Sequence, residues 1–228
     1  MYISRSCLRP DASKKEKFWS SLENRYEIHR LVWSLFSDDS KKNRDFLYRQ
    51  EETNRLPTFY VVSEHEPEDL KEIWQTKSMT YDPILHAEEI LSFILRANPI
   101  VTKQDLAGKH HRHDVVMEAK TRLKEERITR DEWPSDAEIV QDEGFKWLEK
   151  KGQQNGFSIK EEFVRADGYM QQKFYKLDGK QLINISSIDF SGALTVIDPE
   201  LFKNALFKGI GPAKGFGCGL MMVRRTLT

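Results

Sequence analysis

The pattern of hydrophobic and polar positions in the first third of the chain alternates between the period of a strand and the period of a helix. The clearest helical segment is residues 20–36, where apolar side chains recur at helical spacing and Ser20 and Glu23 have the spacing of a capping box. Short runs rich in β-branched and aromatic residues predict strands around it. In chain order, we expect a strand at 2–8, the helix at 20–36, strands at 45–51 and 58–63 separated by a turn that includes Pro57, a helix at 67–75 and a strand at 77–81.

This β-α-β-β-α-β order is that of a ferredoxin-like domain, in which two helices cover one face of a four-stranded antiparallel sheet. The order begins again near Glu89. The second set is a strand at 90–98, a long charged loop at 103–132, a helix at 135–151, a hairpin of strands at 163–176 and 181–187 that turns at Asp178-Gly179, a strand at 192–197, a helix from Asp198-Pro199 to Phe207, and a strand at 220–225. We therefore predict an α+β fold of two tandem ferredoxin-like (RRM-like) βαββαβ domains, at residues 1–87 and 88–228.

Composition narrows the class of protein. Lys and Arg together number 36, as do Asp and Glu, and the hydrophobic content of 39% is typical of a globular chain. The longest apolar runs, such as 31–36 and 90–95, are much shorter than the roughly 18 to 20 residues that span a bilayer, and the N-terminus does not resemble a signal peptide. We therefore expect a cytoplasmic protein without membrane contact. Cys7 and Cys218, at opposite ends of the chain, are expected to be reduced.

The end of the chain is locally basic and rich in glycine. No acidic residue follows Glu200, and five of the twelve glycines fall within residues 209–219, here called the glycine segment. Glycine lets a backbone approach an anion closely, so the segment predicts contact with phosphate groups. The residues expected to make this contact are Lys214, Gly209, Gly211, Gly215 and Gly217. The alternative is a flexible turn before the last strand.

A nucleotide cofactor is not expected at the glycine segment. A dinucleotide-binding loop lies between a strand and the helix that follows it, whereas here a helix precedes the glycines. A phosphate-binding loop of the Walker type would need Gly-Lys-Ser/Thr, which this sequence lacks. The segment therefore favours contact with a nucleic-acid backbone over a nucleotide pocket.

The helix at 20–36 has two apolar stripes, and the second contains Tyr26 and His29 among aromatic residues. Residues three apart lie on adjacent turns, so both side chains can reach one ligand atom. An imidazole titrates near neutrality and can move protons in either direction, so the two residues form a plausible acid/base pair. The pattern alone leaves a packed histidine in an aromatic stripe as the alternative.

Two further segments carry clustered histidines or cations. His110, His111 and His113 lie in a basic run that we interpret as a solvated or RNA-facing loop. A metal site is the alternative, but the nearby carboxylates lack ligand spacing and no metal is expected. The predicted hairpin carries cations interleaved with aromatic residues, which fits a basic ribbon along RNA or else an ordinary exposed hairpin. These cations are Arg165, Lys173, Lys176 and Lys180.

Four motifs occur in order along nearly the whole chain. They are Met1-Tyr2-Ile3-Ser4, then Tyr26-x-x-His29 before a hydrophobic run, then Leu95-Arg96-Ala97-Asn98-Pro99, and finally Gly209-Ile210-Gly211-Pro212-Ala213-Lys214 continuing to Gly217-x-Gly219-Leu220. Together they resemble the CRISPR repeat-cleaving endoribonucleases of the Cascade (type I-E) system, the CasE family. The last two motifs are specific, whereas residues 103–133 depart from the family pattern.

The resemblance implies a metal-independent endoribonuclease that binds the stem-loop of CRISPR repeat RNA and cuts precursor crRNA at the base of the stem. The products would be a 2′,3′-cyclic phosphate and a 5′-hydroxyl, and the protein would stay bound to the mature crRNA beside other Cascade subunits. It implies proton transfer by His29, contact of Tyr26 with the 2′-hydroxyl or phosphate, and charge stabilisation by Arg30, without a cofactor. The alternatives are a non-catalytic RNA-hairpin-binding subunit and a nucleotide-using enzyme built on the glycine segment.

Overall fold

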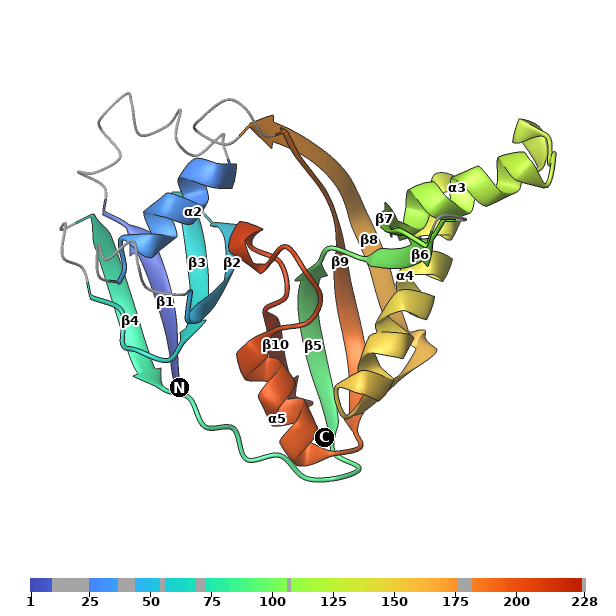
Figure 1. Cartoon of the computed structure of the whole chain (residues 1–228). Coiled ribbons are helices and arrows are strands. Elements are labelled where there is room, and N and C mark those ends of the chain that lie inside the picture. The colour runs from blue at the N-terminus through green and yellow to red at the C-terminus, as the bar shows by residue number, and fades with distance from the viewer. Residues whose placement is uncertain are drawn as a thin grey trace.

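The structure, a computed structural model, describes residues 1–9, 25–36, 44–53, 56–68, 73–105, 108–175 and 182–226 of the chain. Its strands form two four-stranded antiparallel sheets and a separate two-stranded hairpin. The two large sheets stand side by side, and residues 81–89 connect them along the bottom of the view in Figure 1. In the described part of the chain, no helix is both long and apolar enough to cross a membrane.

The first sheet has the strand order β2-β3-β1-β4. Its elements are β1 (Tyr2–Leu8), α2 (Arg25–Trp33), β2 (Phe46–Thr53), β3 (Leu56–Ser63) and β4 (Trp74–Thr80). Because alternate residues of a strand face the same side, Phe59 and Val61 of β3 both enter the core that α2 closes with Ile28 and Val32. This strand order, with β1 and β3 in the centre, confirms the ferredoxin-like prediction.

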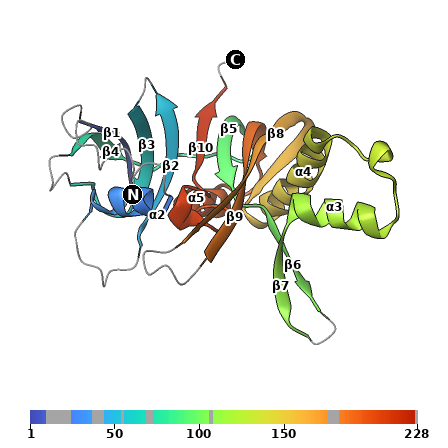
Figure 2. The ribbon, with the colours of Figure 1, turned by 90° about the horizontal axis from the view of Figure 1, so that it is seen from above.

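The second sheet repeats the arrangement in the order β10-β5-β9-β8. Its elements are β5 (Ile90–Ala97), α4 (Asp136–Gln154), β8 (Phe157–Tyr175), β9 (Leu182–Val196), α5 (Pro199–Lys208) and β10 (Met221–Arg225). Helices α4 and α5 pack on the sheet through Trp147, Leu148, Phe202 and Leu206, and Figure 2 shows both helices on one face. The tandem fold is therefore confirmed, while the division at residue 87 stays a prediction.

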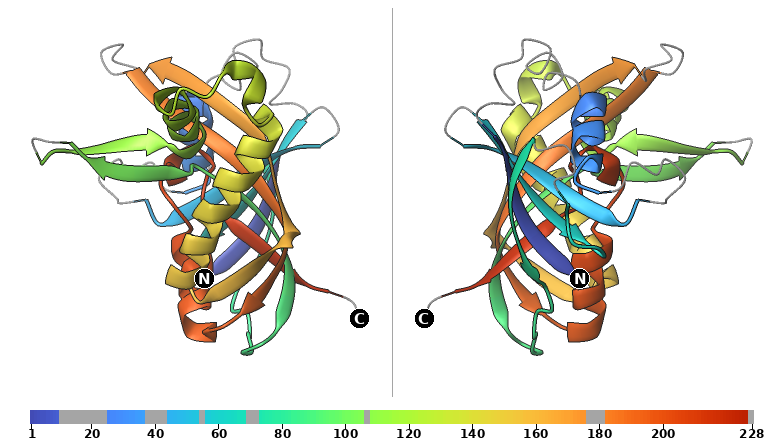
Figure 3. Two further views of the ribbon diagram at one scale, coloured as in Figure 1. Left: turned by 90° about the vertical axis from the view of Figure 1, so that its right-hand side faces the viewer. Right: turned by 90° about the vertical axis from the view of Figure 1, so that its left-hand side faces the viewer.

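Strands β8 and β9 are much longer than the strands beside them. They contain 19 and 15 residues, and their far ends extend beyond the rest of the second sheet toward α2 (Figures 1 and 3). The predicted separate strand at 192–197 is wrong, because β9 continues without a break to Val196. The predicted turn at Asp178-Gly179 lies outside the described residues.

The predicted long loop at 103–132 is also wrong. Strands β6 (Ile100–Gln104) and β7 (His110–Asp114) pair as a hairpin that projects from the molecule (Figure 2), and α3 (Val115–Glu125) follows directly. A short 3-10 helix covers Arg130–Glu132. Helix α3 forms because it buries a small apolar face, consisting of Val115, Val116 and Ala119, while its charged residues remain accessible to water.

Two boundaries in the first domain differ from the prediction. Pro57 lies within β3 opposite Glu52 rather than in a turn. Strand β4 begins at Trp74, not at residue 77, because the fully buried Trp74 ring belongs to the core. Residues 69–72 of the predicted helix at 67–75, and the capping box of Ser20 and Glu23, lie outside the described residues.

The two domains meet through an ionic and an apolar contact. The Asp189 carboxylate on β9 accepts from Arg96 Nη2 at 2.8 Å and pairs with Arg49 Nη2 of β2 at 3.2 Å. Beside this group, Leu47 and Val62 of the first sheet share a buried cluster with Leu220. Strand β2 is thereby fixed against the second domain.

Replacing Asp189 with Ala is expected to lower the free energy of unfolding by about 2 kcal/mol, because Arg49 would be left without this partner in a nearly buried position. Urea denaturation followed by circular dichroism measures the change. The control is Asp167→Ala, which removes a carboxylate whose partner Arg165 has a side chain that is 77% exposed, and which should change stability by less than about 0.5 kcal/mol. Equal effects of the two substitutions would contradict the role of Asp189.

Candidate active site

His29 lies at the junction of the two domains. Its ring on α2 is flanked by Phe46 of β2 and by Phe216 of the glycine segment, with ring centroids 6.4 and 6.1 Å away. Trp33, one turn further along α2, donates from its indole Nε1 to His29 Nε2 at 2.9 Å. The helix therefore presents one edge of the imidazole to Trp33 and leaves the other edge toward the second domain.

This hydrogen bond fixes the protonation of His29. Because Nε2 accepts a hydrogen bond from Trp33, the neutral imidazole carries its own proton on Nδ1. Nδ1 is buried and has no hydrogen-bond partner among the described residues. Burial, with a smaller effect from the charge of Arg44, lowers the pKa of His29 to about 4. The ring is therefore neutral at pH 7 and presents an N–H group.

Gly215 faces the imidazole from the glycine segment. A Cβ placed at Gly215 would lie 3.5 Å from His29 Cε1, 3.8 Å from His29 Nδ1 and 3.0 Å from Arg44 Nη1. The Tyr48 hydroxyl of β2 donates to the Gly215 carbonyl at 3.1 Å. The predicted catalytic helix and the predicted phosphate-binding segment, almost two hundred residues apart, thus meet at one place.

Arg44 is a residue of this site that the sequence did not single out. Burial lowers the pKa of its guanidinium, and its Nε is buried without a hydrogen-bond partner among the described residues. His29 Nδ1 and Arg44 Nε are therefore two donors without an acceptor among the described residues, and both belong to side chains that lie beside Gly215. Such an arrangement suits a group rich in oxygen, such as a phosphate.

Lys214 lies at the start of the short 3-10 helix η3 (Lys214–Phe216). Its ammonium donates to the carbonyl of Lys208 at 2.6 Å, which places it at the C-terminal end of α5. Burial, followed by the charges of Arg44 and Lys208, lowers the pKa of Lys214. Lys214 and Arg44 therefore form a region of concentrated positive charge beside His29.

The remaining glycines predicted to bind RNA have packing roles. A Cβ at Gly209 would lie 2.8 Å from Leu47 Cδ2, and one at Gly211 would lie 3.1 Å from the Trp147 ring. Gly217 is buried and has a φ of 79°, a left-handed backbone that glycine adopts at little cost. Of the predicted glycines, Gly215 is the one that the structure places beside His29 and Arg44.

Tyr26 and Arg30 lie on α2 with His29. Tyr26 is half-buried and precedes His29 by three residues, so the two residues occupy adjacent turns. The Arg30 side chain is 58% exposed and pairs with Glu27 of the same helix at 3.5 Å. Their catalytic roles stay predictions, and Arg44 is the more deeply buried of the two arginines.

The hairpin cations do not form one stripe. In the β8–β9 register, Arg165 lies opposite Ser191 and Lys173 lies opposite Asn184. Ser191 and Asn184 are an odd number of residues apart on β9, so they face opposite sides of the sheet, and the two cations beside them do the same. Lys176 and Lys180 lie outside the described residues. The hairpin nevertheless reaches the site, because the Phe174 ring lies 5.1 Å from the Phe216 ring.

Two of the three histidines in β7, His111 and His113, are paired with carboxylates. His111 Nε2 lies 2.8 Å from Asp105 Oδ2, and His113 Nδ1 lies 3.7 Å from Glu118 Oε2. Within the described ranges, no group of three or more His, Cys, Asp or Glu residues is arranged to hold a metal ion.

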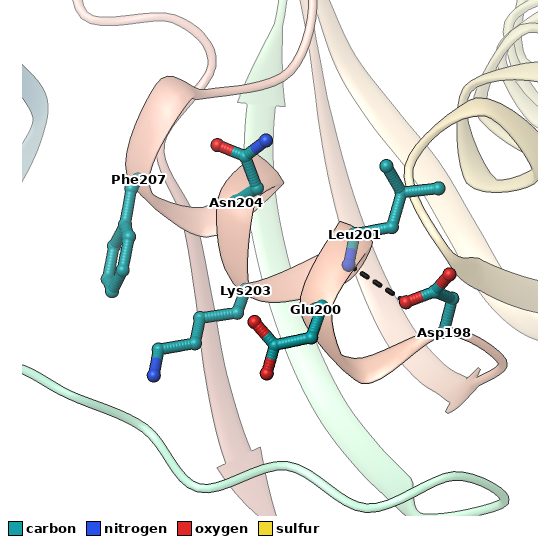
Figure 4. Close-up of a pocket in the computed structure, with 6 residues that line it drawn as sticks. All are labelled: Asp198, Glu200, Leu201, Lys203, Asn204 and Phe207. Atoms are coloured by element: carbon teal, nitrogen blue, oxygen red, sulfur yellow. Dashed lines mark hydrogen bonds between the residues drawn. The ribbon is translucent and has the colours of Figure 1, made fainter.

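A hollow of about 570 Å³ along α5 is a weaker candidate for a phosphate site. Figure 4 shows its side chains, among them the carboxylates of Asp198 and Glu200. Asp198 Oδ1 accepts from the Leu201 N–H at 2.9 Å as the helix cap, and Lys203 pairs with Asp82 at 2.5 Å. These polar groups already have partners, and the two carboxylates repel an anion.

Comparisons with known proteins all find similarity to CRISPR-associated proteins. A family model described as CRISPR associated protein matches residues 1–225. The CRISPR system Cascade subunit CasE of Escherichia coli (strain K12) is 29% identical over 198 residues, which are 86% of this chain and 89% of that protein. The CRISPR-associated endoribonuclease Cse3 of Thermus thermophilus is 27% identical over 241 residues, covering 98% of this chain and 99% of that protein. A solved structure of CRISPR endoribonuclease Cse3 bound to 19 nt RNA has a TM-score of 0.70 and 26% identity, covering 98% of this chain and 100% of that one.

The substitution Trp33→Phe should raise the pKa of His29 by roughly one unit, because a protonated ring needs Nε2 as a donor and the indole N–H opposes it. An NMR titration of the ¹⁵N-labelled imidazole measures both the pKa and the tautomer. Trp133→Phe removes an indole that donates to the Ile128 carbonyl at 3.0 Å and should leave the His29 titration unchanged. A His29 ring protonated on Nε2 at pH 7 in the wild type would rule out the assignment.

Proposed function

The chain belongs to the family of CRISPR-associated proteins, and from this membership we propose that it is a metal-independent endoribonuclease acting on CRISPR repeat RNA. It would bind the repeat stem-loop and cut precursor crRNA at the base of the stem. The relatives support this proposal, because one is named an endoribonuclease and another a Cascade subunit. The protein would keep the mature crRNA and join other Cascade subunits. A cytoplasmic location stays a prediction.

One observation carries the proposal: the Nδ1 edge of His29 and the Arg44 guanidinium both face Gly215 of the glycine segment. Their two unpaired nitrogens and the Lys214 ammonium provide donors and positive charge around one point. A phosphodiester of RNA has the oxygens and the negative charge that such a site lacks. The scissile phosphate would therefore lie between α2 and the tip of the glycine segment.

In the proposed reaction, the 2′-oxygen of a ribose bonds to the adjacent phosphorus, and the bond from phosphorus to the 5′-oxygen breaks. The 2′-hydroxyl loses a proton and the leaving 5′-oxygen gains one, which gives a 2′,3′-cyclic phosphate and a 5′-hydroxyl. His29 carries an N–H at Nδ1, the edge that faces the glycine segment. To act as the acid, the ring would first be protonated to the imidazolium, which would then give its Nδ1 proton to the leaving oxygen and become neutral. The negative charge of a bound phosphate raises the imidazole pKa and so favours this protonated form. Tyr26 would act on the 2′-hydroxyl from the adjacent turn.

Arg44 would stabilise the charge that develops on the phosphorane. Its guanidinium lies beside the place of the reacting phosphate, and burial strengthens its electrostatic effect. Lys214 and the backbone of the glycine segment would hold the RNA strand. Arg30, which is exposed on α2, would add a weaker electrostatic contribution from the edge of the site.

The stem of the repeat would lie along the second domain. Arg165 and Lys173, on opposite faces of the β8–β9 ribbon, would contact separate phosphates. Lys176 and Lys180, which lie outside the described residues, are proposed as further phosphate contacts. Phosphate contacts fix orientation and register more than they read sequence. RNA binding is therefore expected to weaken as salt concentration rises.

Replacing His29 with Ala is expected to lower the single-turnover cleavage rate by about 10² to 10⁴, the usual contribution of a proton-transfer residue. The assay uses the repeat RNA from the CRISPR array of the same genome, in EDTA, with products separated by gel electrophoresis. His86→Ala, in the exposed connection between the domains, is the matched control and should cut at the wild-type rate. Undiminished cleavage by the His29 variant would contradict the mechanism. Binding without cleavage by the wild type would favour a non-catalytic RNA-binding subunit.

Replacing Arg44 with Gln should lower the cleavage rate constant by about 10² while RNA affinity changes much less, because the lost interaction strengthens as charge develops. The matched variant Arg30→Gln should lower the rate by less than about threefold, because an exposed cation contributes little. Single-turnover rates and dissociation constants are measured on the same RNA. A larger loss of rate from the Arg30 substitution would reverse the assignment of the two arginines.

A further inference from the structure

A second hollow opens beside Phe216, and no step of the proposed reaction uses it. Its volume is about 280 Å³, and its walls come from the β6–β7 hairpin, the β8–β9 hairpin and the glycine segment. Three parts of the chain that are distant in sequence thus build one concave surface next to the candidate active site. Phe216 also flanks His29, so an occupant of the hollow would be close to the scissile phosphate.

The polar end of this hollow is Asp114. Its Oδ1 accepts from the Met117 N–H at 2.8 Å, as the cap of α3, and from the Tyr169 hydroxyl at 3.1 Å. Its Oδ2 is buried and has no hydrogen-bond partner among the described residues. A buried carboxylate oxygen without a donor is costly, so the site favours an occupant that brings one.

Two amides in the wall already donate to other protein groups. Asn98 Nδ2 donates to the Ser186 carbonyl at 2.6 Å, and Gln171 Nε2 donates to the Tyr169 hydroxyl at 2.8 Å. Arg112 of β7 also lines the hollow and is exposed. Among the described lining residues, the buried side-chain atom without a partner is therefore Asp114 Oδ2, an acceptor that favours a ligand with a hydrogen-bond donor.

Part of the wall is apolar and suits a flat ring. Ile100, Ile185, Pro212 and Phe216 contribute this part, and an aromatic side chain is a common platform for an unstacked base in RNA recognition. Ala213, which also lines the hollow, has a φ of 57°, an uncommon conformation for a residue other than glycine. The glycine segment thus holds Pro212 and Phe216 on either side of a strained residue.

We propose that this hollow, the Asp114 pocket, binds one unpaired nucleobase of the RNA next to the cut. Asp114 Oδ2 would accept a hydrogen bond from the exocyclic amino group of adenine, cytosine or guanine. Uracil has a carbonyl oxygen where cytosine has its amino group, and that oxygen would face the carboxylate lone pairs. The proposal rests on the proposed function, since it requires an RNA substrate. It adds a specific base contact to a site otherwise built for phosphates.

The test uses the repeat RNA from the CRISPR array of the same genome, made uncleavable by a 2′-deoxy nucleotide at the attacking position. Each unpaired base near the cut is replaced in turn by its analogue without the amino group: purine riboside for adenosine, uridine for cytidine and inosine for guanosine. Dissociation constants are measured by fluorescence anisotropy. For the wild type, one position should lose about tenfold in affinity, the size of a hydrogen bond to a charged acceptor.

Asp114→Asn is the decisive variant. Asn is also a good helix cap, so α3 is retained, while the amide nitrogen replaces the Oδ2 acceptor with a donor. At the position identified in the wild type, this variant should lose the preference for an amino group and, for a cytidine position, prefer uridine. Asp114→Ser, which keeps a capping hydroxyl, should reduce the discrimination below twofold. Asp105→Asn, a carboxylate at the end of β6 in the same hairpin, is the matched control and should retain the tenfold preference.

The outcomes separate the pocket from the proposed function. Cleavage of the unmodified RNA in EDTA tests the function independently. If the wild type cleaves, but no unpaired position discriminates or Asp114→Asn keeps the wild-type preference, the pocket proposal is overturned and the function stands. Failure of the wild type to bind the repeat RNA would overturn both.

Discussion

The position of the glycine segment between the two domains is the constraint on which the candidate site depends. Strand β2 contacts this segment twice: Leu47 packs at its start against Gly209, and the Tyr48 hydroxyl holds its tip at Gly215. Side chains of consecutive residues point to opposite faces of a strand, so Leu47 and Tyr48 contact the glycine segment from the two faces of β2. The tip cannot leave His29 without a loss of packing in both domains. The site therefore exists only while the domains are docked.

Electrostatics explain why the proposed site favours an anionic ligand. Burial lowers the pKa of His29, Arg44 and Lys214, and the charge of Arg44 lowers the other two further. These shifts mean that positive charge is unfavourable there in the free protein. A phosphate reverses the balance, because it supplies a negative charge and acceptors for the unpaired nitrogens. In the proposed mechanism, binding of the anion would therefore favour the protonated form of His29, because the phosphate charge and the ring lie in the same local field.

The sequence predicted those elements that local signals specify. Asp198-Pro199 starts a helix by itself, and the structure confirms it; the four motifs likewise predicted the family, which the family match confirms. Segment 103–132 was missed because the buried face of α3 is small and its remaining residues are charged. At the site, the sequence singled out His29 and the glycine segment separately, but their contact and the role of Arg44 were not predicted, because both arise only when the domains dock. Gly209 looked like a ligand contact, whereas tertiary packing explains it.

Gly215 shows how a glycine that leaves space in the candidate site can be distinguished from one needed for the fold. Gly209 and Gly217 have φ values of 76° and 79°, so backbone conformation alone favours glycine at both. Gly215 is not among the residues with positive φ, and a side chain there would meet no conformational barrier. What a Cβ would meet is Arg44 Nη1 at 3.0 Å and His29 Cε1 at 3.5 Å, the two groups that face the proposed phosphate. The absence of a side chain at Gly215 thus keeps open the space in which the reaction is proposed to occur. Glycine is favoured at this position by the neighbouring site residues and not by the backbone conformation of the loop.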